Sequence, residues 1–293
     1  MKRLIYILFL LVAVSTTVNA QFVQNNSMSK AEFYIQKAEF DSAQKYIDIA
    51  TTQEEFTTLA KVWFYRSFIY KEQYKTKEKQ ELNSALRNEC AISIHKLYKI
   101  DTASTYLPQT EPLVKYISST YYNDAARAIN NENYELANQN FNQYKQLQTL
   151  INTDKNTLND HEIQFKFAIA TAISKGQDKV DSTQRHQLVA IYKEILAIDQ
   201  NNPSANYNLS LLYYNEGVDI VNNMDYDMEF ENLMATQEKI ADLFNEALPF
   251  MLKAYEANYR KEDTLEGLKN IYYGLNDTEK SNYYKQELES LQK

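Results

Sequence analysis

One pattern of apolar residues recurs along this chain at the spacing of an α-helix face. The stretch 202–217, "NPSANYNLSLLYYNEG", crowds leucines and tyrosines into one run that a glycine closes. Bulky residues followed three, four and seven residues later by further apolar ones lie on a single side of a helix. The same order appears in four other stretches, at 62–73, 120–133, 164–176 and 264–276. The pattern therefore predicts a repeated amphipathic helix.

Composition excludes most other fold classes. The 293 residues include only four glycines and four prolines, which leaves few sites for tight turns. A many-stranded sandwich or barrel needs such turns at short intervals. With 44% hydrophobic and 13% aromatic residues, the chain also lacks the signature of disorder. We expect an all-α fold.

Each of these helices is followed by a second one with small and large residues in alternation. "YELANQNFNQYKQL" places Ala137, Phe141 and Tyr144 on one face, and "EALPFMLKAYEAN" places Ala247 and Met251 similarly. Small residues allow two helices to approach closely, so this order predicts helix hairpins that stack on their neighbours.

The hairpins resemble the tetratricopeptide repeat, whose unit reads W-x2-L-G-x2-Y, then A-x3-F, then P. The resemblance covers nearly the whole chain and is closest to secreted or periplasmic members from Gram-negative bacteria over 186–293. The first block is filled by Trp63, Arg66, Ser67 and Tyr70, and again by Asn206, Leu209, Ser210 and Tyr213, with Pro203 in the proline slot. The family implies a right-handed superhelix, here an α-solenoid of about six hairpins.

We place the hairpins at about 27–51, 58–101, 112–152, 161–200, 204–259 and 262–292. The fifth contains an insertion, 218–246, whose apolar residues keep helical spacing and predict longer helices; if the second of these continues through Pro249, that proline should kink it. "DTASTYLPQTEP", 101–112, is a hinge or a long loop between repeats, and we prefer the loop. Core packing is expected of Trp63, Tyr70, Tyr121, Phe165 and Tyr213.

Residues 1–20 have the layout of a secretory signal peptide. Lys2 and Arg3 precede an apolar run from Leu4 to Val14, and Val18-Asn19-Ala20 forms a small-residue exit. An uncleaved anchor is the alternative, but the run falls short of the ~20 residues that span a bilayer. No later stretch is apolar enough to span. We expect export to the periplasm, or release outside the cell.

Other chemistry has little support in the sequence. The three histidines are far apart, and the only cysteine, Cys90, is expected to be a small buried residue. Neither a phosphate-binding glycine loop nor a nucleophile or zinc motif occurs, so we expect no enzyme activity, metal or cofactor. A net charge of −8 disfavours nucleic acid as a partner.

The resemblance implies a concave groove lined by the first helix of each hairpin. The chain is then a non-catalytic interaction scaffold or adaptor of the cell envelope that binds an extended or helical segment of another protein. Asn123 and Asn208 would hydrogen-bond a peptide backbone, whereas the cations of a carboxylate clamp are missing. The expected groove residues are Phe64, Tyr65, Phe68, Tyr122, Asn123, Lys166, Phe167, Tyr207, Asn208, Leu211 and Tyr214.

Two alternatives remain. The solenoid could instead pack against copies of itself as a structural protein of the envelope. It could also bind glycans, with the groove tyrosines as stacking platforms. The last helix, "TEKSNYYKQELESLQK", is rich in Lys, Glu and Gln, and such a polar end favours a capped monomer.

The first prediction concerns the leader. We expect the exported chain to begin at Gln21, because cleavage should follow Ala20. Sequencing the N-terminus of the protein isolated from the periplasm tests this. A chain that keeps residues 1–20 and stays with the membrane would contradict it.

Overall fold

The computed structural model describes residues 26–175, 181–225 and 227–291, and these are helical with connecting turns and no strand. The expectation of an all-α chain is therefore confirmed for the described residues. The signal peptide expected at 1–20 lies outside them. The structure divides into two compact units, which are described separately below.

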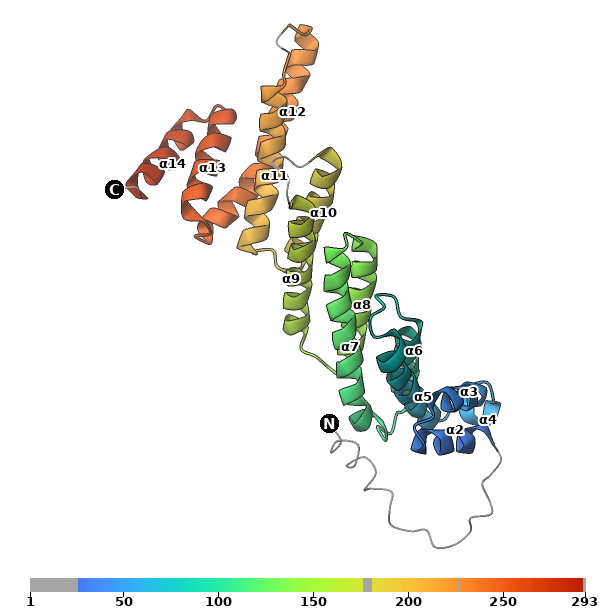
Figure 1. Cartoon of the computed structure of the whole chain (residues 1–293). Coiled ribbons are helices and arrows are strands. Elements are labelled where there is room, and N and C mark those ends of the chain that lie inside the picture. The colour runs from blue at the N-terminus through green and yellow to red at the C-terminus, as the bar shows by residue number, and fades with distance from the viewer. Residues whose placement is uncertain (1–25, 176–180, 226, 292–293) are drawn as a thin grey trace. The chain divides into compact units, whose positions relative to one another are not determined.

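Unit 1 comprises Met1–Arg127 and Leu136–Thr153. Consecutive helices pack together, α2 on α3 and α5 on α6, and α3 also packs on α5 (Figure 1). A five-residue π-helix, η1, continues α5. The elements are α2 (Ser27–Gln36), α3 (Phe40–Ala50), α4 (Glu54–Thr57), α5 (Ala60–Gln73), η1 (Tyr74–Glu78), α6 (Ala85–Ile100), α7 (Leu107–Asn130) and α8 (Tyr134–Leu150).

Unit 2 comprises Ala128–Glu135 and Asp154–Lys293, so the ends of α7 and α8 near their shared turn belong to it. The same pairing recurs, α9 with α10, α11 with α12 and α13 with α14. Its remaining elements are α9 (Lys155–Ser174), α10 (Ser182–Ile198), α11 (Pro203–Asn222), α12 (Phe230–Glu256), α13 (Lys261–Gly274) and α14 (Thr278–Leu291).

The insertion at 218–246 is helical on both sides of its turn, because α11 continues to Asn222 and α12 begins at Phe230. Pro249 lies inside α12, which runs without a break through it.

The segment 101–112 is a loop only as far as Tyr106, so the expectation of a loop was wrong for 107–112. The Asp101 carboxylate accepts hydrogen bonds from the backbone N–H groups of Thr105, Tyr106 and Leu107, at 3.0, 2.6 and 3.1 Å. These bonds satisfy donors that the start of a helix leaves without partners, and α7 begins at Leu107. Pro112 then falls inside α7.

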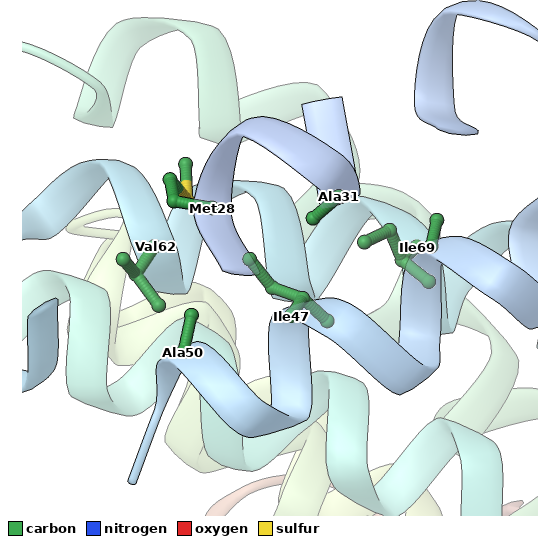
Figure 2. Packing of buried hydrophobic residues seen from close by; sticks show 7 residues of the cluster. Met28, Ala31, Ile47, Ala50, Val62 and Ile69 are labelled. Carbon is green, nitrogen blue, oxygen red and sulfur yellow. The ribbon is translucent and has the colours of Figure 1, made fainter. Parts of the chain in front are cut away.

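The core at the start of unit 1 combines alanines with β-branched residues (Figure 2). Ala31, Ala43 and Ala50 let α2, α3 and α5 approach closely, while Ile47 and Ile69 fill the space between these helices. Burying one such isoleucine contributes about 1.5–3 kcal/mol. Of the residues expected in the core, Tyr70, Tyr121, Phe165 and Tyr213 are buried, and Trp63 is half-buried and donates from Nε1 to the Thr57 carbonyl.

Arg87 is a fully buried cation in unit 1, at 0% exposure. Its guanidinium contacts the Asp124 carboxylate on α7, donates to Asn140 Oδ1 on α8 at 3.0 Å, and lies 4.0 Å from the Tyr121 ring centroid. Another bond reaches the Leu82 carbonyl at 2.9 Å. One side chain of α6 therefore joins α6, α7 and α8.

In unit 2, two glycines leave space for the ring of Phe244. A Cβ atom added at Gly217 on α11 would lie 2.7 Å from the Phe244 ring, and one at Gly274 on α13 would lie 2.3 Å from it. Phe244 of α12 thus lies between two helices that approach closely only because both positions lack a side chain. Ser210 adds a 2.8 Å hydrogen bond from α11 to the Ala247 carbonyl.

The Arg87 arrangement gives the second prediction. Asp124→Ala should destabilise the chain by about 3 kcal/mol, because it leaves a buried guanidinium without its carboxylate. Arg127→Ala is the matched control, since Arg127 pairs with the same Asp124 from an exposed position and should cost less than about 1 kcal/mol. Urea unfolding measures both. Equal losses would contradict a special role for the buried pair.

Candidate interaction surface

Unit 1 presents an aromatic and charged surface on one side of α5. Phe64 and Tyr65 are both half-buried, with ring centroids 5.5 Å apart. The Tyr106 ring, just before α7, lies 5.1 Å from that of Phe64. Lys61, one turn earlier, pairs with Glu32 of α2 at 2.5 Å. We call Glu32, Lys61, Phe64, Tyr65 and Tyr106 the α5 face.

Two side chains of the α5 face, Tyr65 and Lys61, have shifted pKa values. Burial raises the pKa of the Tyr65 hydroxyl, and the charge of Glu32 adds to the rise. Burial alone would lower the pKa of Lys61, but its hydrogen bond and charge interaction with Glu32 raise it overall. At neutral pH Tyr65 is therefore a neutral phenol and Lys61 an ammonium, beside the rings of Phe64 and Tyr106.

Phe68 is not part of this face, although it follows Phe64 by one turn. Its ring lies 6.0 Å from that of Phe40 on α3 and 4.8 Å from the Lys71 ammonium. It therefore contributes to packing between α3 and α5.

The two expected groove residues of α7, Tyr122 and Asn123, differ in their exposure. The Tyr122 ring lies 6.2 Å from Phe141 and 5.0 Å from Tyr144, both on α8. Tyr122 thus packs the α7–α8 pair together. Asn123 is exposed.

The expected groove residues of α9 contact their partner helix in unit 2. Lys166 forms an ion pair with Glu194 of α10 at 2.5 Å. The Phe167 ring lies 6.2 Å from that of Tyr192, also on α10. Both side chains therefore join α9 to α10.

Tyr207 is buried, and the expectation that it is exposed in a groove was wrong. The turn between α12 and α13 covers it: the Tyr259 ring lies 5.7 Å away and the Arg260 guanidinium 5.1 Å away. Asn208 donates to the Ser204 carbonyl of its own helix at 2.8 Å, so its amide is already engaged.

Three expected groove residues of α11 are half-buried: Asn208, Leu211 and Tyr214. Tyr214 stacks on Phe244, with ring centroids 5.6 Å apart. Burial raises the pKa of Tyr214. Leu211 and Tyr214 form a smaller candidate surface in unit 2.

Sequence reasoning missed three members of the α5 face: Glu32, Lys61 and Tyr106. Tyr106 was assigned to a loop, and only the cap at Asp101 brings it beside Phe64. Glu32 belongs to α2, where no spacing rule connects it to Lys61. Charge was the one signal that could have connected them, because the acidic Glu32 and the basic Lys61 lie on the first helices of consecutive hairpins.

Comparisons with known proteins leave the family open: no family model matches the chain, and no curated protein gives a significant match. Within the described ranges, no helix is both long and apolar enough to cross a bilayer. Over the same residues, no group of three or more His, Cys, Asp or Glu side chains is placed to hold a metal ion. Cys90 is buried, as expected.

The position of Tyr207 gives the third prediction. Tyr207→Ala should cost about 3 kcal/mol of stability, as expected for a large buried ring that leaves a cavity. Asn215→Ala, at an exposed position of the same helix, should change stability by less than about 0.5 kcal/mol. Thermal unfolding of both variants checks this. A Tyr207→Ala variant as stable as the control would contradict the burial of the Tyr207 side chain.

Proposed function

We propose that this chain is a non-catalytic protein-interaction scaffold built as a tetratricopeptide-type solenoid, a right-handed superhelix of about six hairpins. The consecutive pairing of helices within each unit supports it, as do the small residues where helices meet: Ser67 and Ala137 are 0% exposed. A hairpin of this kind cannot bury its apolar face alone, so neighbouring hairpins complete the core and leave one side for partners.

The observation that carries the proposal is the α5 face. Half-exposed aromatic rings offer a partner a large contact area at little cost in side-chain entropy, and tyrosine and arginine dominate binding hot spots for related reasons. Phe64 and Tyr106 together present two rings 5.1 Å apart. The Lys61–Glu32 pair beside them supplies a donor and an acceptor for a peptide backbone.

A protein segment fits this surface better than a small molecule. The rings lie on a helix side rather than in an enclosed pocket, and pockets for small ligands bury most of the ligand surface. An apolar side chain of the partner would pack on Phe64 and Tyr106, while its backbone or polar groups meet Lys61 and Glu32. Leu211 and Tyr214 would offer a second apolar contact in unit 2.

We propose further that the chain acts as a monomer in the periplasm. The layout of residues 1–20 supports export. Exposed polar residues on α14, including Lys285, Gln286 and Glu289, disfavour stacking of this helix on another copy.

A photo-crosslinking experiment tests the surface and gives the fourth prediction. Phe64 is replaced by the photoreactive residue p-benzoylphenylalanine, and in a second variant Ile92 is replaced in the same way. Ile92 is the matched control because it is an exposed apolar residue on α6, the second helix of the same pair. After irradiation of intact cells, we expect a crosslinked protein from position 64 and none from position 92.

Two outcomes would contradict the proposal. Crosslinks from position 92 alone would place partners on the second helices. Products of the mass of two copies from position 64 would favour self-assembly over a scaffold for other proteins. Circular dichroism of both variants first establishes that each is folded.

A further inference from the structure

The paired ends of α11 and α12 carry exposed apolar side chains. Phe230 is 76% exposed and Met234, one turn later on α12, is 52% exposed; Val221, near the end of α11, is 37% exposed. Figure 1 shows these helix ends extending beyond the other helices of unit 2. The first buried residue of α12 is Ile240. We call the described residues of 219–238 the tip.

The tip is also strongly acidic. Residues 203–238 contain no lysine, arginine or histidine. Arg185 of α10 pairs with Asp219 at 2.8 Å and with Glu216 at 3.8 Å, which neutralises only the base of the tip. Nearer the turn, in the part of the chain that the structure describes, no cationic side chain lies within 4.0 Å of four carboxylates: those of Asp225, Asp227, Glu229 and Glu231.

We propose that the tip docks a cationic protein segment that carries apolar side chains, such as a basic amphipathic helix. The partner's apolar side chains bury Phe230, Met234 and Val221. Its lysines or arginines meet the carboxylates around them. This surface is separate from the α5 face and does not depend on the function proposed for it.

Charge decides among the possible occupants. A second copy that docked tip to tip would bring carboxylates against carboxylates, and like charges across an interface cost affinity. Anionic lipid and nucleic acid are repelled for the same reason. A neutral apolar partner would leave the carboxylates without counter-charges and partly desolvated. A basic, partly apolar segment satisfies both features of the tip at once.

The exposed apolar residues are needed because charge alone does not fix a binding position. An acidic surface attracts any cation weakly, and salt screens that attraction over about 10 Å at 0.1 M. Phe230 and Met234 lie on the same side of α12 because one turn separates them, so they form a directional contact. Methionine is flexible and polarizable, which suits contact with varied side chains.

The test uses the whole exported chain and a fluorescein-labelled 18-residue peptide, a helix of leucine and lysine with leucines on one face. A second peptide replaces every lysine by glutamate. Fluorescence polarization gives Kd for each. We expect the lysine peptide to bind and the glutamate peptide not to bind, with binding of the lysine peptide weakened about tenfold when salt rises from 0.05 to 0.3 M.

Two variants of the tip and one control locate the binding. Phe230→Ser with Met234→Ser removes the apolar contacts, and Asp225→Asn, Asp227→Asn, Glu229→Gln with Glu231→Gln removes the charges. Each set should raise Kd at least about tenfold. Tyr273→Ser is the control, because Tyr273 is an aromatic residue of α13 that is 77% exposed, and it should leave Kd unchanged. All substituted positions are exposed, so folding should persist.

Four results would overturn the proposal. These are no binding of the lysine peptide, equal binding of the glutamate peptide, unchanged Kd in both tip variants, and self-association of the free chain that Phe230→Ser with Met234→Ser abolishes. The last, seen by sedimentation velocity, would make a second copy the occupant. Hydrogen exchange of the bound chain supplies an independent readout, with protection expected in 219–238.

Discussion

The helices that pair along the described residues depend on close contact with a neighbour, because helices of ordinary composition are marginal in water when isolated. Alanines and serines where helices meet permit that contact, and Arg87 fixes it in unit 1. A buried guanidinium needs acceptors in several directions at once, and here Asp124 of α7, Asn140 of α8 and the Leu82 carbonyl supply them. The cation therefore specifies geometry that apolar packing alone would leave adjustable.

The sequence predicted the helices well because their periodicity is strong and glycine and proline are scarce. It failed at 101–112, where two prolines suggested a loop, since no spacing rule shows that Asp101 caps the next helix. The partners of Arg66, which stands where the repeat pattern has leucine, also could not be predicted from the sequence. It pairs with Asp48 on α3 at 2.9 Å and with Glu89 on α6 at 2.7 Å. These contacts are distant in sequence.

The candidate surface was harder to predict than the fold. A helical pattern assigns a residue to one side of its own helix. It does not show which residues of other segments cover that side. Tyr207 has the expected position on α11, yet Tyr259 and Arg260 cover its ring. Phe64 and Tyr65 stay accessible, and they acquire Tyr106 and Glu32 from other segments. The same difficulty hid the tip, whose exposed Phe230 and Met234 cannot be told from core residues by spacing alone.

Phe244, held between Gly217 and Gly274, has a mechanical consequence. The stretch of α12 from Phe230 to Phe244 is about 21 Å long at the rise of an α-helix. At the base of this stretch the Phe244 ring packs against the backbones of Gly217 on α11 and Gly274 on α13. Neither position leaves space for the ring to shift, so a displacement of α12 at Phe244 must be taken up by α11 and α13 as well.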